Sequence, residues 1–209
     1  MKKIIIGLFA CLALFSCKKQ EANPLWTDKT TETVHSITGE YTMVSAQWSA
    51  QADFSGNGTI GNDVLEQMDL YGWMGTQRTK RYGEEYVSIL NRSVVCEPSS
   101  GAKEAYSQVN LYIPVSDFTN KYTGRPDKNG RCTLNVIPFQ FHYWIDADGQ
   151  IELKDLRDFH PGDEHMKLEN VDIVFKEGCI FFNADSVLYD WARDGWQEGH
   201  ISIEFVRNE

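Results

Sequence analysis

The sequence predicts an all-β domain, in which an antiparallel meander closes into a roughly eight-stranded barrel with one short helix. Short runs of alternating apolar and polar residues recur from residue 37 onward, which is the pattern of strands with one solvated face. Turn dipeptides separate many of these runs, and helical periodicity is scarce. About eight or nine strands fit between Gly39 and Phe205, and a two-sheet sandwich is the alternative arrangement.

The first segment, residues 1–16, has the features of a bacterial lipoprotein signal peptide. Two lysines precede an apolar run over residues 4–15, and this run is too short to span a bilayer. The ending Leu14-Phe15-Ser16-Cys17 resembles a lipobox. This resemblance implies that Cys17 carries acyl chains such as palmitate and becomes the mature N-terminus. An ordinary signal peptide that is cut elsewhere is the alternative.

An acylated Cys17 predicts that the protein is attached to a lipid bilayer in the cell envelope. Residue 18 is Lys rather than Asp, which under the sorting rule of Gram-negative lipoproteins implies the outer membrane. Residues 17–36 are polar and show no regular period, so they predict the lipidated Cys followed by a flexible tether. Residues 37–209 then form the barrel domain. The formal charge of −10 argues against a nucleic-acid partner, which would need clustered Lys and Arg.

The C-terminal half carries the clearest strand and turn signals. Apolar side chains alternate with other residues in two runs: Val109, Leu111, Ile113 and Val115, and then Ile201, Ile203 and Phe205. Tight-turn dipeptides lie between apolar runs at Asn129-Gly130, Asp148-Gly149, Glu177-Gly178 and Asp194-Gly195. Strands that are joined this way are antiparallel neighbours.

The apolar phase changes within residues 131–146. Leu134 and Val136 occupy even positions, whereas the later apolar residues occupy odd ones: Phe139, Phe141, Tyr143 and Ile145. A one-residue bulge at Pro138 would reconcile the two phases, because Pro has no ladder donor. The second phase places Gln140, His142 and Trp144 on the outer face, as amphipathic surface.

The start of the domain is similar to a known type of domain. A short helix is predicted over residues 62–69, where Asn62 or Asp63 could cap it. This helix follows a first strand, Ile37–Ala46, and a loop, Asp53–Thr59. Together they resemble the opening of lipocalin-like (calycin-type) domains in Bacteroidetes-type lipoproteins, with Tyr41 in place of Trp and Asn57 in place of Asp. The resemblance implies a barrel and no particular activity.

The loop that begins at Asp53 is the best local candidate for a metal site. Read as a calcium loop, it places oxygen-bearing side chains at alternate positions: Asp53, Ser55, Asn57 and Thr59, with Asp63 as a second carboxylate. Calcium prefers such oxygen ligands, but the position of the usual bidentate Glu is Val64. The sequence therefore predicts weak Ca²⁺ binding at best, and a turn that satisfies its own backbone is the alternative.

Other polar groups give weaker signals. The loop His160–His165 contains two imidazoles and two carboxylates without metalloprotease spacing, and no catalytic motif is present, so an enzyme is the least favoured class. Three cysteines follow Cys17, which allows one internal disulfide, and Cys96 with Cys132 is preferred over a pair with Cys179.

Two functional hypotheses remain open from the sequence. In the first, the domain is a structural or interaction module, and an exposed aromatic patch of Trp144, Trp191 and Trp196 would favour a protein partner. In the second, the barrel holds one small apolar molecule among its inward aromatic side chains. If those side chains fill the core and leave no space for a ligand, the first hypothesis is favoured.

Overall fold

The structure is a computed structural model that describes residues 26–70, 76–81, 84–89, 93–116, 119–120, 122–126, 134–156 and 167–208. The helices are α1 (Asp28–Ile37) and α2 (Val64–Leu70). The strands are β1 (Gly39–Ala52), β2 (Gly61–Asp63), β3 (Thr76–Arg81), β4 (Glu84–Ile89), β5 (Ser93–Val95), β6 (Ala105–Ser116), β7 (Thr119–Asn120), β8 (Arg125–Pro126), β9 (Leu134–Ile145), β10 (Ile151–Lys154), β11 (Leu168–Lys176), β12 (Cys179–Asp190) and β13 (Gly195–Arg207). Neither helix in these ranges is long and apolar enough to cross a membrane.

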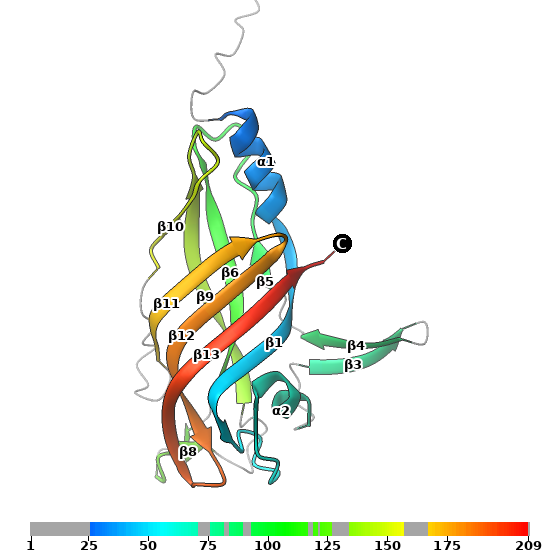
Figure 1. The fold of residues 1–209 in the computed structure, drawn as a ribbon, viewed down its shortest axis with the longest axis vertical. Coiled ribbons are helices and arrows are strands. Elements are labelled where there is room, and N and C mark those ends of the chain that lie inside the picture. Colours follow the sequence, from blue (N-terminus) through cyan, green and yellow to red (C-terminus); the bar gives the residue numbers. More distant parts are fainter. Residues whose placement is uncertain are drawn as a thin grey trace, which may run out of the picture.

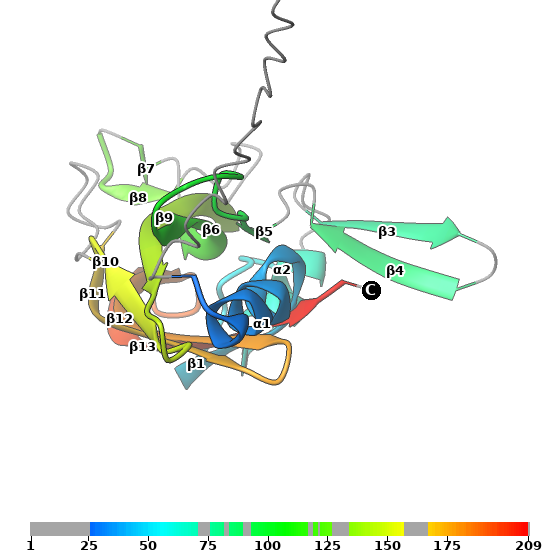
Figure 2. The ribbon, with the colours of Figure 1, turned by 90° about the horizontal axis from the view of Figure 1, so that it is seen from above.

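The all-β prediction is confirmed. Nine strands form one antiparallel sheet. Eight of them follow the order β10-β9-β6-β5-β1-β13-β12-β11 and curl into a half-barrel (Figure 1), and the short β2 pairs with β1 beside this path. The first long strand, β1, pairs with the last, β13. From β11 through β13 to β1 and on to β10, neighbouring strands of the curled sheet therefore follow one another in chain order, apart from the short strands that are skipped. Strands β10 and β11 are the two edges of the sheet. Seen from above, the sheet curves beneath α1, and the β3–β4 hairpin projects to one side (Figure 2).

The predicted hairpins are confirmed where the structure describes them. Asp148-Gly149 lies in the turn between β9 and β10, Glu177-Gly178 joins β11 to β12, and Asp194-Gly195 ends the turn between β12 and β13. Glu177 and Gly178 have φ values of 52° and 78°, as a tight hairpin turn requires. The Asn129-Gly130 turn lies outside the described residues.

The predicted bulge at Pro138 is wrong. Strands β6 and β9 pair without a register shift from Ala105 opposite Ile145 to Ser116 opposite Leu134. In β9 the buried positions nevertheless change from even to odd residues at Pro138. The end of β6 that pairs with this part of β9, from Ile113 to Ser116, is buried on both faces. Strand β12 lies against this end, where Tyr189 N donates a hydrogen bond to Ser116 Oγ at 2.9 Å. The buried face of β9 therefore changes without an extra residue, at the end of the sheet where β6 is covered on both faces.

The tether prediction is wrong for residues 28–36, which belong to α1. Thr27 caps the helix by accepting a hydrogen bond from Thr30 N. Three threonine hydroxyls, spaced three residues apart, then donate to carbonyls of the β9–β10 turn: Thr27 to Ala147, Thr30 to Asp146 and Thr33 to Gly149. Only Val34 and Ile37 supply buried apolar side chains, so the helix is fixed largely by polar contacts that apolar periodicity does not reveal.

The second helix follows the prediction closely. Asp63 precedes α2, and its Oδ1 accepts a hydrogen bond from Glu66 N at 2.8 Å. Val64 and Met68 are fully buried, one helical turn apart, and they hold α2 against β1. The core itself lies inside the curled sheet and receives apolar side chains from all the long strands.

Candidate functional site

The Asp53 loop satisfies its own backbone. The side chain of Asp53 is almost fully buried, and its oxygens accept hydrogen bonds from Gly56 N at 2.7 Å, Gly58 N at 2.9 Å and Ser55 Oγ at 3.2 Å. Asn57 Oδ1 accepts from Thr59 N in the same way. These are the contacts of an Asx-rich turn, so the oxygens that a cation would need already have protein donors.

The carboxylate of Asp63 likewise accepts hydrogen bonds from other groups of the fold. Its two oxygens accept from Glu66 N and from Gln47 Nε2. Among the described residues, no group of three or more His, Cys, Asp or Glu side chains could hold a metal ion. Of the two interpretations of this loop, the hydrogen bonds favour the turn.

The interior of the half-barrel is filled by aromatic and aliphatic side chains. Phe139 on β9 packs edge-on against Phe182 on β12, with ring centroids 5.7 Å apart, although these two strands lie near opposite ends of the sheet order. All six inward residues named from the sequence pattern are at most 3% exposed: Phe139, Phe141, Tyr143, Ile201, Ile203 and Phe205. The side chains of the two walls thus meet across the axis.

A small cleft lies where the sheet remains open. It has a volume of about 100 Å³ and is lined by Ile37, Tyr41, Ile151, Phe175 and Cys179 among others. Tyr41 is buried, and its hydroxyl donates to Ile37 O at 2.6 Å. Burial raises the pKa of Tyr41 to about 12. The volume is well below the roughly 300–1,000 Å³ that is typical of small-molecule sites.

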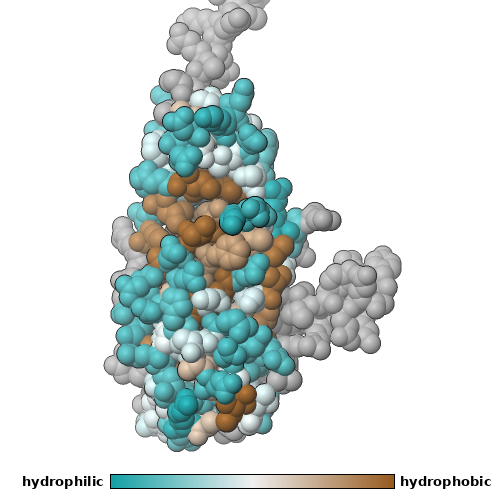
Figure 3. Space-filling model, viewed as in Figure 1, coloured by the Kyte–Doolittle hydropathy of each residue, from teal (hydrophilic) through white to brown (hydrophobic). Residues whose placement is uncertain are grey.

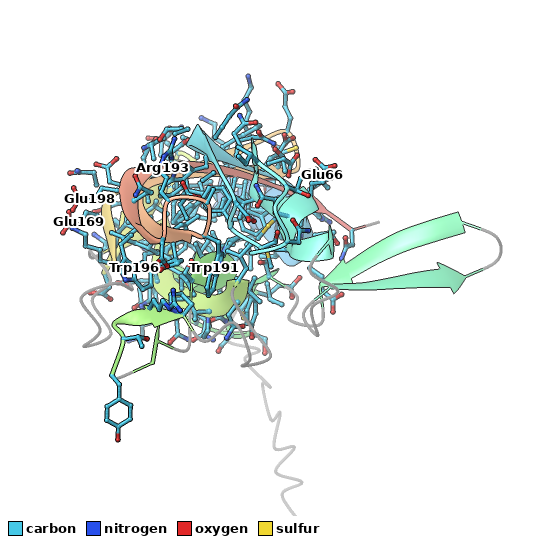
Figure 4. All side chains as sticks on the ribbon, turned by 90° about the horizontal axis from the view of Figure 1, so that it is seen from below. Glu66, Glu169, Trp191, Arg193, Trp196 and Glu198 are labelled. Carbon is cyan, nitrogen blue, oxygen red and sulfur yellow. The ribbon has the colours of Figure 1, made fainter. Side chains whose placement is uncertain are left out.

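The three tryptophans whose common exposed patch would favour a protein partner do not lie together. Trp191 and Trp196 both pack against Tyr189, with ring centroids 4.9 and 5.2 Å from it, and they lie together near the middle of the lower end (Figure 4). Trp144 lies at the other end of the barrel, on the outer face of β9 beneath the ammonium of Lys154. A single patch of these three tryptophans, which would have favoured a protein partner, is therefore not present.

The lower aromatic cluster is tied together by Asp194. Its carboxylate accepts hydrogen bonds from the Tyr189 hydroxyl and from Arg125 Nη1, and these two bonds hold the pKa of Asp194 below its ordinary value. Trp196 Nε1 donates to Gly124 O at 2.8 Å. These contacts attach the segment around β8 to the β12–β13 hairpin, so the role of Asp194 here is structural.

The outer face of β9 follows the predicted phase. His142 is half-buried and stacks on Tyr106 of β6, with ring centroids 5.1 Å apart and planes 12° apart. His142 Nδ1 lies 3.2 Å from Asp155 Oδ2. Gln140 is exposed and Trp144 is half-buried on the same face, which agrees with the amphipathic-surface interpretation.

A polar cleft of about 360 Å³ opens on the outer face of β11–β13 and includes Glu169, Asp185, Glu198 and His200. His200 Nδ1 lies 3.2 Å from Asp185 Oδ1, and Asn170 Nδ2 donates to Oδ2 of the same carboxylate. Hydrogen bonds from Asn170 and from His200 lower the pKa of Asp185. The described hydrogen bonds of His200 go to Ser49 and Asp185 and do not include the Ser186 hydroxyl, which also lines this cleft.

An apolar surface on the upper outer face was not anticipated from the sequence. Figure 3 shows apolar side chains gathered around the β11–β12 hairpin, below α1. Val174 on β11 is 45% exposed and stands opposite Phe181 on β12, and Val44 on β1 is 48% exposed. The run Asp172–Lys176, with alternate apolar residues on both faces of an edge strand, is the sequence signal that could have indicated it.

Several predicted groups lie outside the described residues: Cys17, Cys132 and the loop His160–His165. Cys96 and Cys179 are free thiols in the structure, so Cys96 does not form the preferred disulfide here. The side chains of these two residues are half-buried.

No family model, curated protein or solved structure matches the chain. The resemblance to lipocalin-like domains therefore remains a prediction, and the fold stands on the geometry of the sheet alone.

Proposed function

We propose that the chain is an exported lipoprotein of the cell envelope, anchored in the outer membrane by acyl chains on Cys17, and that its domain acts as a structural or interaction module. The packing of the interior carries this proposal. Phe139 and Phe182 are in contact from opposite walls, so the half-barrel has the filled core of a scaffold. Apolar side chains such as Val44 and Val174 are instead displayed outside, where a protein partner could cover them.

The chemistry of the surface supports a role without catalysis. Three of the acidic groups have structural contacts, because Asp53, Asp63 and Asp194 bind backbone or side-chain donors of the fold itself. The proposal accordingly assigns no substrate and no nucleic-acid partner to the chain.

The anchor is tested by replacing its cysteine. In Cys17→Ser, the protein should leave the membrane fraction and lose labelling by an acyl-chain probe, because no thiol remains to receive the lipid. Cys96→Ser is the matched control, since it also removes one thiol, and it should keep both properties. Unchanged labelling of Cys17→Ser would refute the lipoprotein assignment.

The small cleft between the sheet edges favours a second candidate function, the capture of an apolar molecule. Ile151 and Phe175 from the two edge strands line it, and its volume of about 100 Å³ would hold only a short alkyl group. Phe175→Trp would reduce the cleft, and Val174→Trp would place the same indole side chain on the outer face. A lipid that co-purifies with wild type and Val174→Trp but not with Phe175→Trp, as read by native mass spectrometry, would support this candidate over the module.

A further inference from the structure

The upper half of β11 is an unprotected strand edge. Among the described residues only β12 pairs with β11. Its lower half is irregular, because the register shifts between Glu169 and Asp172 and Asn170 has a φ of 51°, and bulges of this kind discourage further pairing. The segment 172–176 pairs regularly with β12. It reads Asp-Ile-Val-Phe-Lys and has neither Pro nor Gly to prevent the addition of another strand.

The backbone of this segment has a defined orientation. Glu177 and Gly178 form a two-residue hairpin turn, so the flanking residues Lys176 and Cys179 face each other as a hydrogen-bonded pair. Hydrogen-bonded pairs alternate along an antiparallel ladder, which directs the N–H and C=O groups of Lys176, Val174 and Asp172 toward β12. The same groups of Ile173 and Phe175 therefore point away from the sheet.

This edge is complementary to itself. When two copies of the segment lie antiparallel with Val174 opposite Val174, Ile173 of each copy faces Phe175 of the other. These are the residues whose backbone groups are free, so they form hydrogen-bonded pairs across the new boundary. In the same register Asp172 of each copy stands opposite Lys176 of the other, which gives two pairs of opposite charge.

The side chains are available for these contacts. Asp172 and Lys176 are exposed, and the ion pairs described in the structure include neither of them. Val174 is 45% exposed and adjoins Phe181, so pairing would join the apolar outer faces of the two copies. Phe175, which is only partly buried, would gain cover from the partner's Ile173.

We propose that the chain forms a two-fold homodimer in which the 172–176 segments of two β11 strands pair antiparallel about Val174. Charge complementarity favours a second copy as the occupant, because Asp172 of each copy meets Lys176 of the other when the edge pairs with itself in this register. The inference depends on the geometry of β11 alone and holds whether or not Cys17 is lipidated.

Cross-linking at the two-fold axis tests the register. Residues that face each other in a non-hydrogen-bonded pair have Cα atoms about 4.5 Å apart, within the range that a disulfide spans. Full-length Val174→Cys, made in a Cys179→Ser background to remove the neighbouring thiol, should form a covalent species of twice the chain mass on mild oxidation. Val44→Cys in the same background is the matched control, because Val44 is equally exposed, at 48%, but lies on β1 away from the edge. It should remain monomeric on a non-reducing gel.

Charge reversal tests the pairing independently of the new thiols. Asp172→Lys alone and Lys176→Asp alone each place like charges opposite one another twice, and should raise the dimer dissociation constant about tenfold. The double variant Asp172→Lys with Lys176→Asp restores opposite charges and should return the constant to near the wild-type value. Sedimentation equilibrium of the full-length chain in detergent gives these constants, and thermal melting confirms that each exposed substitution leaves the fold intact.

Three results would overturn the proposal. The first is equal cross-linking of Val174→Cys and Val44→Cys. The second is a Val174→Cys adduct whose mass is not twice that of the chain, which would assign the edge to a strand of another protein. The third is a double charge variant that associates no better than the single reversals, because the self-complementary register would then not exist.

Discussion

At the scale of single residues, Phe141 shows how the alternating pattern becomes a packed core. The residue is 1% exposed and lies 5.9 Å, between ring centroids, from Phe139. Phe139 in turn contacts the opposite wall through Phe182. The position therefore has neighbours on several sides, and its ring cannot be removed without leaving a void.

We predict that Phe141→Ala lowers the free energy of unfolding by about 3–5 kcal/mol, through lost contacts and the cavity that remains. Urea denaturation would measure this change. Ile60→Ala is the control, because Ile60 is 59% exposed, and its substitution should change stability by no more than about 0.5 kcal/mol. If Phe141→Ala unfolded at the same urea concentration as wild type, the interior would be a pre-existing space, and the ligand-binding candidate would replace the module.

At the scale of secondary-structure elements, the contact between α1 and the β9–β10 turn decides how the N-terminal segment is held. Gly149 has a φ of +80°, and a Cβ atom there would lie 2.9 Å from Thr33 Oγ1 and 3.2 Å from Lys29 O. The helix approaches this closely because glycine has no side chain. The same approach allows the Thr33 hydroxyl to donate to Gly149 O.

We predict that Gly149→Ala destabilises the protein in two ways, through the left-handed backbone and through collision with α1. Gly58→Ala is a matched control, since Gly58 has a φ of +90° and a Cβ atom there would meet nothing within 4 Å. Gly58→Ala should cost about 1 kcal/mol from the backbone alone, and Gly149→Ala about 1–3 kcal/mol more. If both variants lost the same free energy of unfolding in denaturant, α1 would not be in close contact with the β9–β10 turn.

At the scale of the whole molecule, the free energy of unfolding should fall at alkaline pH, because the buried tyrosines have raised pKa values in the folded state. Burial raises the pKa of Tyr41 from its ordinary value of 10.0 to about 12, and burial also raises that of Tyr143. Below pH 10 both residues are protonated in the folded and unfolded chains, so their contribution is complete. Between pH 10 and 12 the unfolded chain releases its protons first, and the folded state loses stability.

We predict that the unfolding free energy of wild type falls as the pH rises from 10 to 12, with Tyr41 accounting for about 2–3 kcal/mol of the fall. Tyr41→Phe keeps the ring but does not titrate, so its stability should depend less steeply on pH in this window. Tyr122→Phe, at a 97% exposed position, should behave as wild type does. Parallel curves for Tyr41→Phe and wild type would contradict the assignment.

Local signals were sufficient to predict several long strands of this molecule and the hairpin turns that the structure describes between them. Alternation in runs such as Ile201–Phe205, and dipeptides such as Glu177-Gly178, gave the correct buried faces and hairpins, because period and turn chemistry act between near neighbours in the chain. The capped helix at Asp63 followed from the same kind of signal.

The remaining features depended on contacts between segments that are distant in the sequence. Helix α1 is fixed by threonine hydroxyls that bond to a turn more than 100 residues away, and the burial phase of β6 depends on β12. The Asp53 carboxylate could have served a cation or its own loop, and only the positions of Gly56 and Gly58 decided between them. The sequence determined which segments become strands, since that choice is local. The tertiary structure decided which edges remain unpaired and which polar groups are already satisfied, because both depend on the partners that folding brings together.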